Sequence, residues 1–165
     1  MPLPVSAGDF ILASDMNDAA AWRFPISHLA FTADTGALGT AETVFGTVAS
    51  RTYAANTAYR VRFEVGYTTS VASAGVYFRL RKTSLAGAVV VDMQRQPELA
   101  ANNTLVHRMY LEAMFTTLGS AVTAALVLTA ATSSGTVTVK GAPPSQLDIL
   151  VAGAQSDFPD AQDLT

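Results

Sequence analysis

The feature that most constrains the fold is a two-residue alternation of apolar and polar side chains. In the stretch 58–67, AYRVRFEVGY, the odd positions from Tyr59 to Val65 are apolar and the even positions from Arg60 to Glu64 are charged. Successive side chains of a β-strand point to opposite faces of its sheet, so this pattern is typical of an antiparallel strand with one buried face. The stretch therefore predicts a half-buried strand.

The same alternation recurs along most of the chain. Turn-forming clusters rich in Gly, Pro, Ser and Asn separate the alternating stretches. About eight strands with no helix-length gap between them predict an all-β chain, folded as an antiparallel β-sandwich or jelly roll. We expect the last strand to return beside an early one. The predicted strands are 43–48, 58–67, 75–82, 88–94, 104–115, 122–129, 136–140 and 146–151.

Two pairs of arginines occupy outward positions on two of these strands. The first pair is Arg60 and Arg62, and the second is Arg79 and Arg81. We expect the pairs to lie side by side on one solvated face, where they keep the protein soluble and oppose edge-to-edge pairing.

The composition suggests that part of the surface is covered by other chains. A length of 165 residues suits a single domain with a real core. Half of the residues are hydrophobic, the mean hydropathy is +0.30 and only 14% are charged. Free monomers usually carry more charge and rarely expose large apolar patches. We therefore expect identical or different chains to cover some of this surface, and a small β-domain with an uncharged surface is the alternative.

Charge and cysteine content exclude several classes of protein. The net charge of −3 and the isoelectric point near 5.2 argue against a nucleic-acid partner, which needs a basic face. Without cysteine there is no disulfide framework or thiolate metal site. The beginning of the chain lacks the pattern of a signal peptide, and the longest apolar stretch, 118–135, is too short and too polar to span a membrane. We expect synthesis in the cytoplasm and no membrane partner.

A short helix is predicted within 8–24, GDFILASDMNDAAAWRF. Ser14 is suited to the N-cap, Asp15 and Asp18 suit the positive end of the helix dipole, and Pro25 ends the helix. A helix this short is unstable alone in water, so it must dock on its own β-domain, a neighbouring copy or a larger assembly. The side chains expected to anchor it are Phe10, Ile11, Leu12, Met16 and Trp22.

These patterns divide the chain into three segments. Residues 1–30 are predicted to be an anchor segment with the short helix, and residues 31–152 a jelly-roll-like sandwich. Residues 153–165 form an acidic tail, which by composition is mobile unless it lies on a partner.

No arrangement of residues indicates catalysis. His28 and His107 are far apart, so each is expected to be structural rather than a metal ligand. The carboxylates of Glu64, Asp92 and Glu112 are too sparse to indicate a hydrolase pair. Phosphate-binding and nucleophile motifs are absent from the sequence. We expect a non-enzymatic protein with no cofactor and no metal.

Exposed tyrosines support an alternative function. Tyr77 and Tyr110 occupy outward strand positions, where an aromatic ring can stack on a sugar. Aromatic residues on strands more often serve packing or an interface. A carbohydrate- or receptor-binding module, with a host surface glycan as partner, is therefore the alternative.

The opening of the chain resembles a known group of proteins. The phrase AGDFILASDMND at 7–18 resembles the opening of many bacteriophage virion surface proteins, particularly from phages of actinobacteria. In those proteins, which include tail fibre, minor tail and capsid decoration proteins, a G-x-x-L-T-A-x-x-(L/M)-N phrase precedes a β-sandwich. Here Ala13 and Ser14 stand where Thr-Ala is commoner. The stretch 59–84 resembles, more loosely, the strand–loop–strand of such sandwiches.

This resemblance implies a non-enzymatic structural protein of a bacteriophage virion. Its amino-terminal segment would dock on the tail or capsid surface, and its sandwich would project outward. The expected partners are other virion structural proteins and further copies of the chain, with a homotrimer as the first expectation because closed rotational symmetry suits a projecting module. The resemblance further implies assembly in the bacterial host cytoplasm and a final location on the virion surface.

Overall fold

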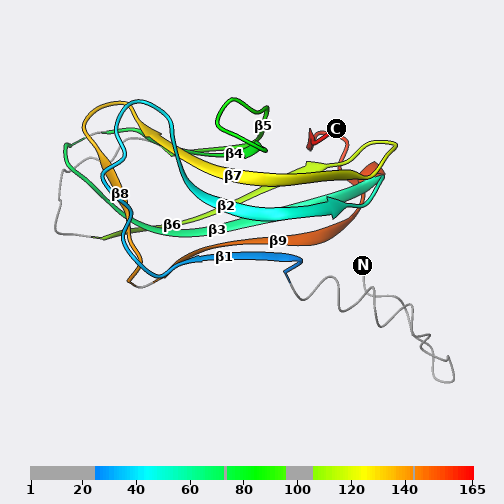
Figure 1. The fold of residues 1–165 in the computed structure, drawn as a ribbon, viewed down its shortest axis with the longest axis horizontal. Coiled ribbons are helices and arrows are strands. Elements are labelled where there is room, and N and C mark those ends of the chain that lie inside the picture. Colours follow the sequence, from blue (N-terminus) through cyan, green and yellow to red (C-terminus); the bar gives the residue numbers. More distant parts are fainter. Residues whose placement is uncertain (1–24, 73, 96–105, 143) are drawn as a thin grey trace, which may run out of the picture.

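The computed structural model describes residues 25–72, 74–95, 106–142 and 144–165. Almost all regular structure in this part of the chain is β-strand (Figure 1). The elements are β1 (Ser27–Phe31), β2 (Thr43–Tyr53), β3 (Thr57–Thr69), β4 (Val76–Lys82), β5 (Val89–Arg95), β6 (His107–Thr116), β7 (Val122–Thr132), β8 (Val137–Val139), β9 (Ser145–Ala154), the 3-10 turn η1 (Gln155–Asp157) and β10 (Gln162–Asp163). The predicted amino-terminal helix and its five anchor residues lie outside the described residues.

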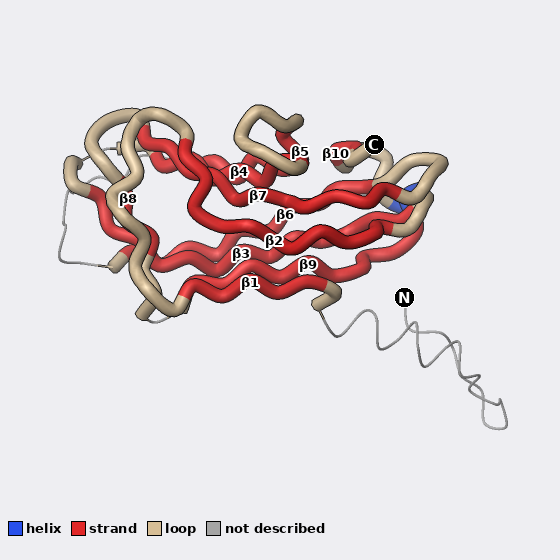
Figure 2. Tube along the Cα trace, in the orientation of Figure 1, coloured by secondary structure: helices blue, strands red, loops and turns tan. Residues whose placement is uncertain are grey.

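The strands form two stacked sheets. A six-stranded sheet has the order β1-β9-β3-β6-β10, with β8 paired to one end of β3, and a four-stranded sheet has the order β2-β7-β4-β5. From β1 to β7 the chain crosses between the sheets at every connection except the β4–β5 hairpin. Most connecting loops gather at the two ends of the sandwich (Figure 2). This strand order is that of a jelly roll, in which most strands that are neighbours in sequence belong to opposite sheets.

The alternating stretches of the sequence are strands. All eight predicted strands are present, as β2 to β9, and β9 lies between β1 and β3, so the return of the last predicted strand to early ones is confirmed. The sequence prediction missed β1 and β10. Strand β1 has only five residues, and β10 has two residues and is defined by its parallel pairing with β6 rather than by a pattern of its own.

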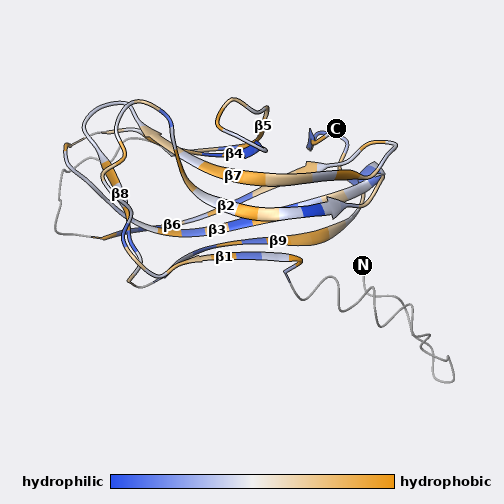
Figure 3. Cartoon of the chain, in the orientation of Figure 1, coloured by the Kyte–Doolittle hydropathy of each residue, from blue (hydrophilic) through white to orange (hydrophobic). Residues whose placement is uncertain are grey.

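Strand β3 is the centre of the core. Its side chains Val61, Phe63 and Val65 are fully buried, while those of Arg62 and Glu64 between them point outward. The strand is bonded to β6 on one side and to β9 on the other, so neither edge is open over the middle of the strand. Figure 3 shows that hydrophilic and hydrophobic residues succeed one another along the strands.

Aromatic rings join the two sheets. Phe63 of β3 and Phe78 of β4 meet edge to face with ring centroids 5.3 Å apart. Toward another part of the core, Tyr53 of β2 meets the edges of Tyr59 and Phe115, which stack on each other at 5.1 Å. Such pairs add about 0.5–1.5 kcal/mol each to the free energy gained by burying their area.

The longest apolar stretch of the sequence contains strand β7. Its inward side chains Leu126 and Leu128 are fully buried, and its outward Val127 and Thr129 are buried as well. In the register of the sheet, Arg81 of β4 lies opposite Val127 and Arg79 lies opposite Thr129. This strand is therefore apolar because it is covered on both faces. Separately, no helix in the described part of the chain is long and apolar enough to cross a membrane.

The predicted common face for the two arginine pairs is wrong. Arg60 and Arg62 are on β3 in the six-stranded sheet, whereas Arg79 and Arg81 are on β4 in the four-stranded sheet. Because the jelly-roll connection between β3 and β4 crosses from one sheet to the other, their outward residues point to opposite sides of the molecule.

The prediction of a mobile tail, or of one ordered by a partner, is also wrong. Strand β10 pairs with β6, and the backbone N–H of Leu164 donates to the carbonyl oxygen of Thr116 at 2.8 Å. The ammonium group of Lys82 donates to the carbonyl oxygen of Leu164, whose side chain is buried. One apolar residue and these hydrogen bonds hold the acidic segment on its own sandwich.

The three-segment division of the chain stays a prediction.

A tight contact joins the β1–β2 loop to the turn before β9. The carboxylate of Asp34 accepts hydrogen bonds from the backbone N–H of Gly141 at 2.9 Å and from Lys140. The hydrogen bond from Lys140 does most to lower the pKa of Asp34, and the hydrogen bond from Gly141 lowers it further. A Cβ atom on Gly141 would lie 2.3 Å from the backbone nitrogen of Ala33, so only glycine fits here without a backbone shift.

The substitution Gly141→Ala should therefore destabilise the fold. We expect a loss of about 1–3 kcal/mol in the free energy of unfolding, the usual range for forcing a methyl group into a packed site. Gly39→Ala is the matched control, because a Cβ at Gly39 would meet no atom within 4 Å. Urea unfolding of both variants checks this, and equal midpoints for the two would contradict the contact.

Candidate functional site

The outer face of the six-stranded sheet carries a row of alternating charges. In the register of the sheet, Arg62 of β3 lies between Glu112 of β6 and Asp148 of β9, and His28 of β1 lies beyond Asp148. His28 Nδ1–H donates to Asp148 Oδ1 at 2.7 Å, and Arg62 Nε is 3.8 Å from Glu112 Oε2. Opposite charges on adjacent strands stabilise the sheet modestly and leave polar groups facing outward.

The next row carries an exposed aromatic ring. Glu64 of β3 lies between Tyr110 of β6 and Gln146 of β9. Tyr110 is 58% exposed, more than any other large hydrophobic side chain among the described residues. Between the two rows is a hollow of about 150 Å³, which we call the Tyr110 pocket and which is lined by Arg62, Glu64, Tyr110, Gln146 and Asp148.

Hydrogen bonds fix the position of the Tyr110 side chain. Its hydroxyl donates to Glu112 Oε2 at 3.0 Å, and Glu112 Oε1 is 3.2 Å from Arg60 Nε. Partial desolvation of the hydroxyl, and then its bond to Glu112, raise the pKa of Tyr110 above the usual value of 10. The hydroxyl thus stays protonated at neutral pH and keeps donating.

The polar groups that line the pocket are only partly used. Arg108 donates a hydrogen bond to Glu64 Oε1 at 3.2 Å, and His28 donates one to Asp148 Oδ1. Among the described residues, the structure gives no partner to the amide of Gln146, to Glu64 Oε2 or to Asp148 Oδ2. The pocket therefore presents an aromatic ring together with free amide and carboxylate groups, which can stack on a ligand and hydrogen-bond to it.

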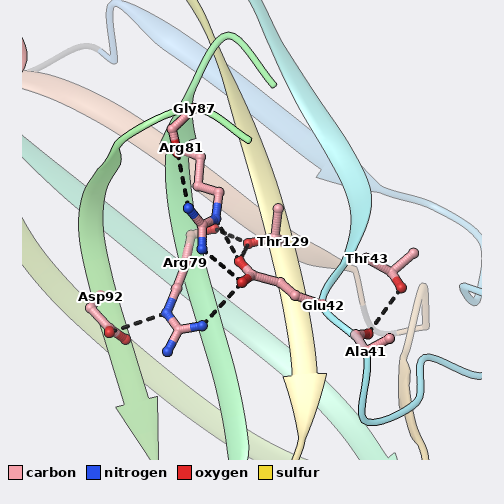
Figure 4. Close-up of polar contacts among 8 residues, drawn as sticks. All are labelled: Ala41, Glu42, Thr43, Arg79, Arg81, Gly87, Asp92 and Thr129. Atoms are coloured by element: carbon pink, nitrogen blue, oxygen red, sulfur yellow. Dashed lines mark hydrogen bonds and ion pairs between the residues drawn. The ribbon is translucent and has the colours of Figure 1, made fainter. Parts of the chain in front are cut away.

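The outer face of the four-stranded sheet holds a different arrangement, centred on Glu42 (Figure 4). Glu42 precedes β2, and its carboxylate accepts two bonds of 2.7 Å from Arg81 and one of 3.1 Å from Arg79. Thr129 of β7 donates to the same carboxylate, and Arg79 also donates to Asp92 at 3.1 Å. We call these five residues the Glu42 cluster.

The Glu42 cluster is a structural clamp rather than a binding site. Both oxygens of the mostly buried Glu42 carboxylate are taken by groups of the protein, and two arginines balance two acids. The hydrogen bond from Arg81 is the largest cause that lowers the pKa of Glu42, to about 2. The cluster fastens the start of β2 across β7 and β4.

Glu42 should make stability depend on pH. Its pKa falls from 4.5 to about 2 on folding, so its contribution is fully present above pH 4.5 and is lost as the pH falls through about 2. We expect Glu42→Gln to lower the free energy of unfolding by roughly 1–3 kcal/mol at pH 7, a range that follows from the size of the pKa shift. The variant should also lose less stability than the unchanged protein as the pH falls from 5 to 2.

Denaturant unfolding as a function of pH measures this effect. Glu112→Gln is the matched control, because the Glu112 side chain is 41% exposed and exposed ion pairs contribute only about 0–1 kcal/mol. The same loss at pH 7 for both variants, or an unchanged pH profile for Glu42→Gln, would contradict the clamp.

The two candidate tyrosines lie on opposite sides of the sandwich. Tyr77 is on the outer face of the four-stranded sheet, half-buried, with the Arg79 guanidinium 5.9 Å from the centre of its ring. Tyr110 faces outward from the other sheet. The two rings cannot form one site, and a ligand role for either stays a prediction.

The other candidate residues are dispersed. His28 lies at the margin of the Tyr110 pocket, while the half-buried ring of His107 packs against Tyr67 at 5.6 Å. Glu64 and Glu112 share the outer face of the six-stranded sheet, and Asp92 belongs to the other sheet. No group of three metal-ligating side chains occurs within the ranges that the structure describes.

A second hollow lies beside the carboxy-terminal turn. Its volume is about 390 Å³, and it is a shallow surface feature formed by one strand residue and the segment after β9. Its lining residues are Met114, Asp157, Phe158, Pro159, Asp160 and Ala161. The sequence pattern gave no sign of it, because its position depends on the docking of the tail.

Comparison with known proteins supports the fold and does not identify a family. No family model matches the sequence, and no curated protein matches it, so the resemblance to actinobacteriophage proteins gains no sequence support. A structure of infectious bursal disease virus, Gt strain, is 14% identical with a TM-score of 0.50, over 82% of this chain and 35% of the viral chain. The chain thus spans about a third of that viral protein's length, and the likeness shows a shared β-sandwich fold alone.

Other solved structures are similar at a lower level. A carbohydrate-binding module of Cellvibrio mixtus lichenase 5A, in complex with cellotriose, is 10% identical with a TM-score of 0.36, over 77% of this chain and 98% of that chain. A structure of an infectious bursal disease virus VP2 subviral particle is 14% identical with a TM-score of 0.45, over 77% of this chain and 37% of that chain.

Proposed function

We propose that the chain is a non-enzymatic structural protein of a bacteriophage virion, a projecting β-sandwich held on the tail or capsid surface by its amino-terminal segment. The observation that carries the proposal is the jelly-roll strand order, an architecture that viral capsid domains use. Fold does not dictate function, so this support is an analogy at the level of the fold. The virus structure with the TM-score of 0.50 supports the same analogy.

The packing and the charge arrangement of the β-sandwich support a structural role. Its aromatic core joins both sheets, and the Glu42 cluster uses its charges within the protein. Among the described residues, no group of three side chains could hold a metal ion. A stable body with few charged residues suits a subunit that is held among other subunits.

The amino-terminal segment supplies the proposed anchor. Strand β1 begins at Ser27, so the segment leaves the body at the edge of the six-stranded sheet. Its apolar side chains would bury themselves against other virion proteins or further copies of the chain, with a trimer as the first expectation. The anchor residues are Phe10, Ile11, Leu12, Met16 and Trp22.

Polar substitutions in the anchor should remove the protein from particles. We expect a full-length variant with Ile11, Leu12 and Trp22 changed to Ser to be absent from virions, because it loses the apolar area that would be buried on docking. The measurement is quantitative mass spectrometry of purified particles made during infection by the virus that encodes the chain. The unfolding free energy of this purified variant should equal that of the unchanged protein.

The control carries the same number of substitutions on the body. Val44, Leu85 and Leu118 are exposed apolar residues of the sandwich, and their change to Ser should leave incorporation intact. Normal incorporation of the anchor variant would refute the proposal, and equal loss of both variants would refute the assignment of the anchor.

A further inference from the structure

We propose that the Tyr110 pocket binds one six-membered ring of a neutral carbohydrate. The inference stands on the geometry of the pocket and does not depend on the proposed virion role. It assigns the ligand to one face of one sheet, and it excludes Tyr77 from the site because Tyr77 faces the opposite side of the sandwich.

The ring of Tyr110 is both exposed and held in place. An isolated exposed aromatic side chain would keep its rotational freedom and lose it on binding, which weakens affinity. Tyr110 has already lost much of this freedom, because its hydroxyl donates to Glu112 and Glu112 is held in turn by Arg60. A rigid aromatic surface open to solvent is suited to stack on the apolar face of a sugar ring.

The pocket has free hydrogen-bonding groups beside this ring. Gln146 offers an amide with both donors and an acceptor, and Glu64 and Asp148 each offer one carboxylate oxygen that no described residue uses. Hydroxyl groups of a sugar both donate and accept, so they can satisfy the amide and the carboxylates together. These groups come from β3 and β9, whose paired register fixes their spacing.

The balance of charge selects a neutral ligand. Arg60, Arg62 and Arg108 face three carboxylates on this surface, and two of the acids line the pocket beside Arg62. An anionic ligand would lie against Glu64 and Asp148, and a cationic ligand would meet Arg62. A ligand without charge avoids both repulsions while it uses the same hydrogen-bonding groups.

The size of the hollow sets the size of the ligand. A cavity of about 150 Å³ holds one six-membered ring such as benzene. A single ring in an open hollow implies weak binding, with a dissociation constant on the order of 1 mM. Several copies displayed together would raise the effective affinity for a polysaccharide that carries the ring repeatedly.

The test titrates the full-length, isotope-labelled protein with methyl glycosides of glucose, galactose, mannose and N-acetylglucosamine. The readout is the chemical shift of each backbone amide. We expect at least one of these sugars to shift amides of β3, β6 and β9 around the pocket in a saturable way. Inorganic phosphate, titrated in parallel, should leave these amides unshifted or shift them without saturation.

Three variants separate stacking from general damage to the face. Tyr110→Ala should weaken binding at least tenfold. Tyr110→Phe keeps the ring but loses the bond to Glu112 that holds it in place, so it should weaken binding less than Tyr110→Ala does. Gln146→Ala should weaken binding severalfold. Tyr77→Ala, on the opposite sheet, is the matched control and should bind as the unchanged protein does. Unfolding curves confirm that each variant is folded.

The outcomes that overturn the proposal are distinct. They are no saturable shift with any of the four sugars, shifts confined to another surface, full binding by Tyr110→Ala, or tighter binding of phosphate than of a sugar. Incorporation of Tyr110→Ala into virions is a separate measurement, so a failure of this proposal and a failure of the virion proposal are distinguishable.

Discussion

The pairing of β3 with β6 and β9 is the interaction on which the rest of the structure depends. It buries Val61, Phe63 and Val65 and sends Arg62 and Glu64 to the outer face. Because side chains alternate with a period of two, a slip of one residue would bury the charges and expose the core. The core and the Tyr110 pocket are therefore consequences of the same register.

The two outer faces of the sandwich use their charges differently. On the four-stranded sheet, Glu42 and its arginines satisfy one another and fasten the start of β2 over β7. On the six-stranded sheet, the charges are spread in cross-strand rows, and part of the hydrogen-bonding capacity around Tyr110 remains available. One face thus uses its charges to fasten the body, and the other keeps unused hydrogen-bonding groups around Tyr110.

Period-two patterns made strands such as β3 and β4 predictable, because each of these has one buried face and one outward face. The same reasoning correctly directs Tyr110 outward. Sheet membership was not predictable in this way, and the arginine pairs illustrate the reason: the path of the chain between β3 and β4 decides their side, not the residues themselves. The docked tail was missed because its attachment depends on a single buried residue, Leu164.

Contacts distant in sequence were beyond pattern reasoning. Glu42 meets Arg79 and Arg81 across 37 and 39 positions, and the sequence near Glu42 gives no sign of either partner. The Tyr110 pocket likewise combines residues of β3, β6 and β9, whose neighbourhood is set by the jelly-roll order. Local alternation predicts which way a side chain points, but only the topology determines what lies beside it.

Amide hydrogen exchange of the full-length protein tests the central role of β3 most directly. Exchange reports local stability, and the most protected amides belong to the part that opens only on global unfolding. The account predicts the slowest exchange in the middle of β3, at the level of global unfolding, with faster exchange in the edge strands β1 and β10. Exchange in β3 as fast as in β1 would contradict the claim that its two-sided pairing holds the sandwich together.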